Sequence, residues 1–359
     1  MIAPSIHALL PVHARKDVSC VARTTEQGIS FEMTGQRLKS ARIMGKKDAG
    51  HSGAGAEPAP PARKVFDKRP GLNLLRLFFR ACRVLPRAVT ARLALLLFLT
   101  PGKRSMTAPE LALIAQAQRE TVVCRGRRVV TYRWGPGPRR ILLCHAWGGN
   151  GTTLGEFIPP LLARGYSVIA FDAPAHGASP GRISDMVEYV STVGMLCEKY
   201  GPFDAAIGHS FGAGNLLWAH RDYGLRADKI VLIGCFIHGV WIIEAFGEAL
   251  GLTPRDVKGM QESLASKYPG ELVWERLSMT DILKSVSAPL LVVHDHDDRA
   301  IPFAQALQLR AASRGPAELL ATSGLGHRRV LRDRDVVRKV VEFIGGSSTH
   351  DPATQGGVA

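Results

Sequence analysis

Two serines of this 359-residue sequence lie in the pattern Gly-X-Ser-X-Gly, which can hold a nucleophilic hydroxyl in a sharp turn between a strand and a helix. Ser210, in GHSFG, follows the run FDAAIG and precedes FGAGNLLWAH, a segment of helical composition. Ser179, in GASPG, runs into a Pro-Gly turn with no helical segment directly behind it. The context therefore predicts Ser210 as a nucleophile and Ser179 as a structural turn.

Five short segments occur in an order that a known family shares: ILLCHAWGGNG, FDAPAHGAS, GHSFG, HDHDDRAIP and GLGHRRVL. In turn they resemble the His-Gly-X-Gly-Gly loop, the Asp-X-Pro-Gly-His-Gly-X-Ser turn, the nucleophile elbow, the acid loop and the histidine loop of the α/β-hydrolase family, which includes esterase-like and lipase-like serine hydrolases. The resemblance covers roughly residues 120–345. It implies that family's fold and a catalytic triad in the chain order Ser, Asp, His.

A serine hydroxyl is a weak nucleophile at neutral pH, so it needs a neighbouring base and a carboxylate that orients the base. The resemblance implies His327 as the base, in a Gly-flanked loop after the last expected strand. The family's acid stands four residues before a proline, which implies Asp298; Asp297 is the alternative, since a slip of one residue redirects the side chain. The acid loop also partly matches a metallo-hydrolase pattern, but Arg299 replaces its final His. We therefore expect a triad of Ser210, Asp298 and His327, and neither a metal nor a cofactor.

Acyl transfer also needs two N–H groups directed at the alkoxide that develops in the transition state. The residue after the nucleophile supplies one of them, here Phe211. The resemblance implies Trp147 for the other and loop-shaping roles for His145 and His176. Ala146 replaces the family's usual glycine in this loop, and an alanine is costlier than a glycine if φ is positive.

The elements that must position these residues alternate along the chain. Runs rich in β-forming residues lie at 121–124, 128–134, 140–144, 166–171, 203–207, 229–233, 289–293 and 317–321. Segments of helical length lie at 153–163, 184–200, 211–222, 303–314 and 333–344. This alternation predicts an α/β domain over 105–345, with a mainly parallel eight-stranded sheet and helices on both faces. The interval from 233 to 289 is too long for a simple crossover, and its apolar stretches predict a helical cap at about 236–287.

The formal net charge of +15 belongs mainly to the N-terminal extension. Residues 1–104 hold 19 Lys and Arg against 6 Asp and Glu, whereas residues 105–359 hold 27 against 25. Residues 1–65 lack a sustained period and end in GHSGAGAEPAPPARK, so we expect disorder there and in the tail at 346–359. Residues 1–15 lack the pattern of a secretory signal, and scattered cysteines suggest a reducing compartment, so we expect a cytoplasmic protein.

Residues 66–104 form a basic, apolar segment. Arg76, Arg80, Arg83 and Arg87 recur at helical spacing with Leu and Phe between them, and Pro86 predicts a break before a second helix through Leu99. Its longest uncharged run is too short to span a bilayer. Cations beside apolar residues are typical of a helix at an anionic membrane surface, and base-reading groups for nucleic acid are missing. The alternative is that residues 72–99 pack on the body of the protein as a brace.

These expectations combine into a serine hydrolase that cleaves a carboxylic ester, thioester or lactone. A serine at the elbow argues against dehalogenase and epoxide hydrolase chemistry, which use a carboxylate there. The apolar residues of the expected cap, from Phe236 to Leu250, suit either an apolar acyl substrate or packing within the domain. An acyltransferase with the same triad, and a non-catalytic interaction protein that keeps the fold, are the alternatives.

Overall fold

The computed structural model describes residues 21–25, 28–32, 71–102 and 104–346. The disorder expected for 1–65 and 346–359 falls mostly outside these residues. The chain divides into two units, Met1–Ala56 and Glu57–Ala359. In the first, β1 (Val21–Thr25) pairs antiparallel with β2 (Gly28–Glu32), from Val21 opposite Glu32 to Thr25 opposite Gly28.

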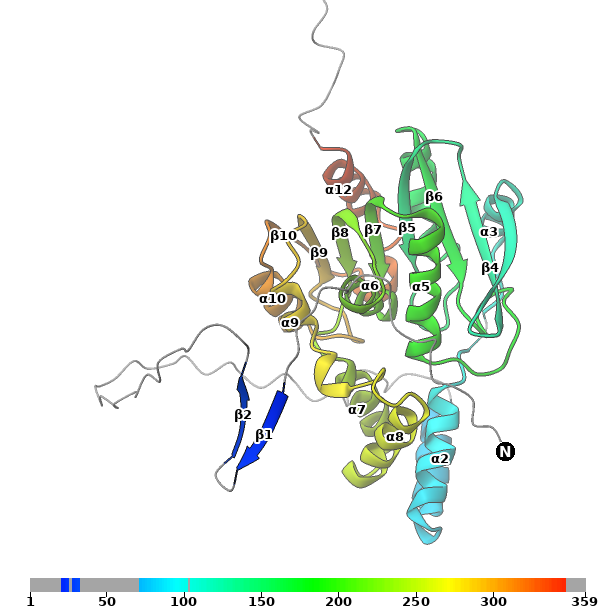
Figure 1. Cartoon of the computed structure of the whole chain (residues 1–359). Helices are drawn as coiled ribbons and strands as arrows, with labels where there is room; N and C mark the ends of the chain where they lie inside the picture. Colours follow the sequence, from blue (N-terminus) through cyan, green and yellow to red (C-terminus); the bar gives the residue numbers. More distant parts are fainter. Residues whose placement is uncertain (1–20, 26–27, 33–70, 103, 347–359) are drawn as a thin grey trace, which may run out of the picture. The chain divides into compact units, whose positions relative to one another are not determined.

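Eight strands of the second unit form one sheet, in the order β10-β9-β8-β7-β5-β6-β4-β3 (Figure 1). Their bounds are β3 Gln118–Cys124, β4 Arg127–Trp134, β5 Arg139–Cys144, β6 Tyr166–Asp172, β7 Phe203–His209, β8 Ala227–Ile233, β9 Leu290–Asp295 and β10 Ala317–Thr322. The pairs β3–β4 and β4–β6 are antiparallel, and the other pairs are parallel. The expected α/β class with a mainly parallel eight-stranded sheet is confirmed.

Helices cover both faces of this sheet. Central strands such as β6 and β9 are buried along their whole length, which an uninterrupted apolar run allows only when both faces are covered. One face packs in a core with α5 (Met186–Tyr200), α6 (Phe211–Asp222) and α10 (Phe303–Ala312). The other packs with α4 (Ile158–Leu162) and α12 (Arg334–Gly345).

The strand order reverses at β5, between β6 and β7. Chain segments leave the carboxyl ends of strands in opposite directions at such a point, which opens a crevice there. The loops after β5, β7, β8, β9 and β10 all meet at this edge. They carry every residue that the sequence analysis assigned to the triad and the oxyanion hole.

Between β8 and β9 the chain forms helices that extend beyond the strand ends. They are α7 (Gly239–Leu250), α8 (Pro254–Lys267), the 3-10 turn η4 (Trp274–Arg276) and α9 (Met279–Leu283). Thr253 and Asp256 begin α8 with reciprocal side-chain and backbone hydrogen bonds, a strong start signal. Figure 1 shows α7 and α8 beyond the carboxyl edge of the sheet, where the expected cap would lie.

The N-terminal segment forms α1 (Leu72–Ala81), the 3-10 turn η2 (Cys82–Val84) and α2 (Arg87–Phe98), and α3 (Ala108–Ala115) follows. Pro86 stands at the N-cap of α2, at the break that the sequence predicts. α1 packs against α7, and α2 packs against α8 and α7. Of the helices that the structure describes, none is both long and apolar enough to cross a bilayer.

Candidate active site

Ser210 occupies a strained turn between β7 and α6. Its φ of 55° and ψ of −115° are rare for a residue with a side chain, and its N–H is held by the carbonyl of Ile233 at 2.8 Å. Such strain persists only where the surroundings impose it, and it is common at functional sites. Gly212 allows the close approach that the turn needs, because a Cβ there would lie 2.3 Å from the carbonyl oxygen of Cys144 on β5.

His327 and Asp298 form a hydrogen-bonded pair. Nδ1 of His327 lies 2.7 Å from Oδ2 of Asp298, and Oδ1 of the same carboxylate accepts the N–H groups of Ala300 (2.7 Å) and Ile301 (3.0 Å). Burial raises the pKa of Asp298, but the hydrogen bond and charge of His327 outweigh it and hold the pKa below its usual value. An ionised carboxylate only accepts, so Nδ1 of His327 carries the hydrogen and Nε2 is left as a base.

The ring of His327 lies at the ends of β7 and β8, next to the elbow. A Cβ on Gly234, the residue after β8, would lie 3.1 Å from Nδ1 of His327. The ring centroids of His209 and His327 are 4.7 Å apart, and Nε2 of His209 lies 2.9 Å from the carbonyl oxygen of His327. Because His209 precedes Ser210 directly, the structure brings Ser210, His327 and Asp298 to one site.

The two other aspartates of the acid loop do not contact His327. Oδ2 of Asp297 accepts the N–H of Gly324, in the histidine loop. Asp295 is buried, and its Oδ2 accepts the hydroxyl of Thr322 and the N–H of Leu325. Both carboxylates therefore tie the acid loop to the histidine loop, and Asp298 alone of the three reaches the imidazole.

Ser179 lies elsewhere and is fully buried. Its hydroxyl donates to the carbonyl of Asp172 at 2.6 Å and accepts the N–H of Val130 at 2.8 Å. The interpretation of Ser179 as a structural turn is confirmed. His294, which the sequence offered only as part of the partial metallo-hydrolase match, is buried. Its Nε2 lies 3.4 Å from Oδ2 of Asp298 and 2.9 Å from the carbonyl of Ile301, and so supports the carboxylate.

Trp147 and Phe211 lie together beside the elbow, with ring centroids 5.0 Å apart. Phe211 is the first residue of α6, so its N–H is one of the free donors of a helix N-terminus. Within the described residues, the main-chain N–H groups of Trp147 and Phe211 have no hydrogen-bond acceptor. Ala146 is not among the described residues with positive φ, so the alanine in place of the family's glycine is not strained.

His145 fixes the loop after β5 from within. It is fully buried; Nδ1 lies 2.8 Å from the carbonyl of Ala146, and Nε2 accepts the N–H of Ala173 at 3.1 Å. Burial, with the bond to Ala146 opposing it, lowers the pKa of His145 from 6.5 to about 4. The folded protein therefore holds this imidazole neutral, and its role here is structural.

This neutral histidine predicts a pH dependence of stability. Between pH 6.5 and pH 4 the unfolded chain binds a proton that the folded chain excludes, so stability falls as the pH falls through this window, by about 3 kcal/mol in all. We expect His145→Gln to flatten this part of the profile, measured as urea unfolding at pH 7 and pH 4.5. His296→Gln, at an exposed histidine, is the control and should keep the wild-type profile. Equal slopes in all three proteins would contradict the assignment.

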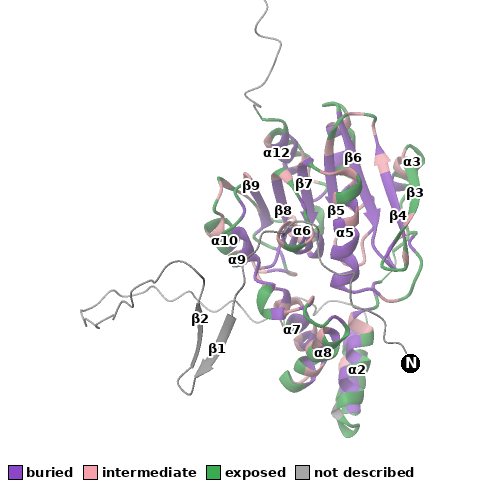
Figure 2. Cartoon of the chain, in the orientation of Figure 1, coloured by how far each residue is buried: buried purple, intermediate pink, exposed green. Residues whose placement is uncertain are grey.

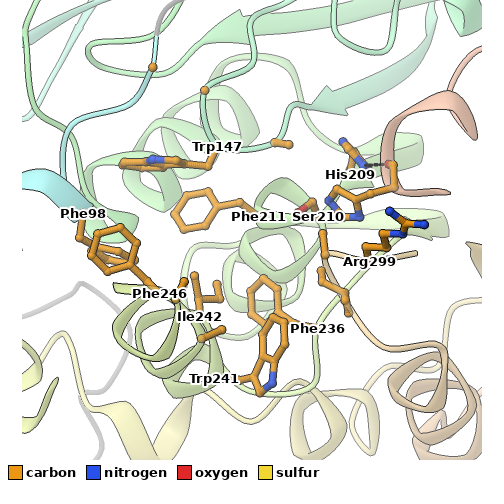
Figure 3. A pocket seen from close by; sticks show the side chains of 18 of the residues that line it. Phe98, Trp147, His209, Ser210, Phe211, Phe236, Trp241, Ile242, Phe246 and Arg299 are labelled. Carbon is orange, nitrogen blue, oxygen red and sulfur yellow. Dashed lines mark hydrogen bonds between the residues drawn. The ribbon is translucent and has the colours of Figure 1, made fainter. Parts of the chain in front are cut away.

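A cavity of about 1060 Å³ opens at Ser210 and His327. Figure 3 shows Phe98, Trp147, Phe211 and Phe246 on one side of Ser210 and Arg299 on the other. Of the helices, α7 contributes the most apolar residues to the wall: Trp241, Ile242, Ala245, Phe246, Ala249 and Leu250. Arg328 and Arg329, which follow His327 directly in the chain, also line the cavity.

The N-terminal helices also line this cavity, which the sequence analysis did not foresee. Leu72 and Leu75 of α1 and Leu97 and Phe98 of α2 are part of the wall. The Phe98 ring stacks on Trp147 with centroids 6.4 Å apart and contacts Phe246 at 5.1 Å. No periodic signal could have shown this, because the contacts join segments about 50 and 150 residues apart.

Comparisons with known proteins agree with this architecture. Residues 139–250 match the family model described as the alpha/beta hydrolase fold. The chain is 26% identical over 258 residues to a non-heme haloperoxidase of Rhodococcus erythropolis, covering 59% of this chain and 93% of that protein. The structure of this chain is similar to that of mouse alpha/beta hydrolase domain-containing protein 10, with a TM-score of 0.51 and 16% identity, covering 64% of this chain and 97% of the mouse chain. It is also similar to the esterase EaEST of Exiguobacterium antarcticum (TM-score 0.50, 17% identity, 64% and 100%).

Proposed function

We propose that this chain, which has the α/β-hydrolase fold and matches that family's model over residues 139–250, is a serine hydrolase that cleaves a carboxylic ester, thioester or lactone. The observation that carries the proposal is the 2.7 Å pair of His327 and Asp298 beside the strained Ser210. A nucleophile, a base and an orienting carboxylate in this arrangement are what acyl-enzyme chemistry requires.

In the proposed mechanism, Oγ of Ser210 attacks the carbonyl carbon of the substrate and passes its proton to Nε2 of His327. The N–H groups of Phe211 and Trp147 stabilise the resulting oxyanion. Collapse of this intermediate breaks the bond to the leaving group, which takes the proton from His327 and departs, and the acyl group stays on Ser210. Water, deprotonated by His327, then attacks the acyl-enzyme, and the acid and the free serine are released. Asp298 stays ionised and stabilises the imidazolium of His327 during both acylation and deacylation.

The proposed substrate carries an apolar acyl group. The wall beside Trp147 and Phe211 is aromatic and aliphatic, and a cavity of about 1060 Å³ is at the upper end for small-molecule sites. We expect kcat/KM to rise along a series of p-nitrophenyl esters from acetyl to palmitoyl, because each added methylene gains about 0.8 kcal/mol when buried. A folded protein that hydrolyses no member of the series would contradict the proposal.

A second candidate shares the triad and is favoured by the name of the haloperoxidase relative. Hydrogen peroxide in place of water at the acyl-enzyme would release a peracid, and the peracid would oxidise a halide while returning to the carboxylic acid. Adding hydrogen peroxide and bromide to the ester assay separates the two. Ser210-dependent bromination supports the second candidate, and an unchanged rate of acid release without bromination supports the esterase.

We place the activity in the cytoplasm, at a membrane surface. Within the described residues five cysteines are free and four of them are buried, as suits a reducing compartment. The part of the chain that would contact a membrane is the segment 72–99, whose two helices line the cavity.

A further inference from the structure

The helix α1 has two faces, and the inner one is fixed to α7. Leu72 and Phe79 are buried on this side. Nε of Arg76 donates to the carbonyl of Ala249 at 2.8 Å, and Arg83 donates to the carbonyl of Gly251 at 3.3 Å. Both cations therefore satisfy carbonyls at the carboxyl end of α7, where the helix dipole favours positive charge. This part of the expected brace is present, and it turns two arginines of the stripe toward the protein.

The outer face of the same segment is apolar and exposed. Leu74 and Leu77 on α1 are 70% and 63% exposed, Val84 on η2 is 89% exposed, and Leu96 on α2 is 53% exposed. Figure 2 shows this side of α2 as exposed. In the part of the chain that the structure describes, nine of the twelve exposed large apolar residues lie between positions 74 and 96. A soluble monomer rarely exposes so many together, so this outer face is suited to a partner.

The charge around the outer face selects the partner. No Asp or Glu occurs from Lys68 to Pro109, whereas Arg80 and Arg92 are exposed on the two helices. A second copy packed through the same face by two-fold symmetry would add the same arginines and no acidic residue from this segment. Residues 1–70 are no better suited, since they carry 12 Lys and Arg against 6 Asp and Glu. A bilayer with anionic headgroups meets the arginines with opposite charge and takes up the leucines below them.

The outer face is continuous with the wall of the cavity. Leu75 is at once partly exposed and part of that wall, and its neighbours Leu74 and Leu77 point to the outer face. On α2, Leu97 and Phe98 are likewise partly exposed and also line the cavity, and they follow directly after the exposed Leu96. An apolar molecule can thus pass from the surface of these helices to Ser210 without crossing a polar region of the helices.

We propose that the outer face of α1, η2 and α2 docks on an anionic bilayer, and that the substrate is an acyl ester resident in that bilayer, which enters the cavity beside α1 and α2. The proposed docking depends on the exposed face and its charge, and not on the proposed activity. The proposed substrate rests on the proposed hydrolase activity.

The test compares the full chain with Leu74→Asp/Leu77→Asp in co-sedimentation with vesicles of phosphatidylcholine, with and without phosphatidylglycerol. The leucines do not line the cavity, so turnover of a short, water-soluble ester should be unchanged in the variant. Leu111→Asp/Leu307→Asp is the matched control, because these leucines are 56% and 47% exposed on α3 and α10. We expect binding to the anionic vesicles that weakens at high salt, and a more than tenfold loss in the Leu74/Leu77 variant only.

Wild-type protein that stays in the supernatant, or equal pelleting of the three proteins, would overturn the docking surface. So would a dimer, seen by sedimentation, that the Leu74/Leu77 variant alone loses, since the face would then join two copies. If the Leu74/Leu77 variant keeps the rate on a vesicle-embedded ester, the entry route is wrong. Normal vesicle binding without turnover of any ester would mean that the proposed function fails while docking stands.

Discussion

Replacing Ser210 by alanine is expected to lower kcat for ester hydrolysis by roughly 10⁴–10⁶-fold, since the covalent route is lost and only the oxyanion donors and binding remain. The fold should persist, because alanine meets the same strain at a φ of 55° as serine does, and the bond from the Ser210 N–H to Ile233 is unaffected. Steady-state kinetics together with the melting temperature check both parts.

Ser179→Ala is the matched control, as the same substitution at the second Gly-X-Ser-X-Gly motif. It removes two buried hydrogen bonds, to Val130 and Asp172, so it should lower the melting temperature and leave kcat nearly unchanged. The two variants are thus expected to differ in opposite ways: Ser210→Ala loses kcat and stays folded, whereas Ser179→Ala keeps kcat and melts at a lower temperature. Full turnover in Ser210→Ala, or its loss in a folded Ser179→Ala protein, would contradict the assignment.

Asp298→Asn is expected to lower kcat by roughly 10²–10⁴-fold. The N–H groups of Ala300 and Ile301 point at one oxygen of the side chain, so the amide oxygen of the variant would stay there. The amide NH₂ would then face Nδ1 of His327, which could only accept. The hydrogen would move to Nε2, and the imidazole could no longer take the proton of Ser210.

Asp297→Asn is the control for this change, one residue away in the same loop. Among the described residues its carboxylate accepts one hydrogen bond, from the N–H of Gly324 at 2.7 Å, and an amide oxygen can keep that bond. We expect less than a tenfold change in kcat. A larger loss in Asp297→Asn than in Asp298→Asn would transfer the role to Asp297.

The fold class and the resemblance to the α/β-hydrolase family could be predicted from the sequence; the sheet confirms the fold class, and the family model over residues 139–250 agrees with the resemblance. The reason is local: the elbow, the acid loop and the histidine loop each lie directly after a strand, and a parallel sheet brings strand ends to one edge. The sequence favours Asp298 but leaves Asp297 as an alternative acid, because both residues follow β9. The turn that ends at Ile301 decides which of the two carboxylates faces His327.

Contacts between distant segments could not be predicted in the same way. The sequence placed the arginines of 76–87 in one stripe, but Arg76 and Arg83 bind the end of α7, more than 160 residues later. The stacking of Phe98 on Trp147 is likewise a contact between segments far apart in the sequence. Helical periodicity shows which side chains share one face of a helix. It does not show which other helix or strand packs on that face, because that depends on the tertiary fold.

The most direct test of the central claim is reaction of the full chain with a fluorophosphonate, followed by peptide mass spectrometry. A serine activated by His327 and Asp298 should form one adduct, on the peptide that contains Ser210. The adduct should be absent in Ser210→Ala and should form much more slowly in Asp298→Asn than in Asp297→Asn. A folded wild-type protein that forms no adduct, or one that carries it on Ser179, would contradict the account.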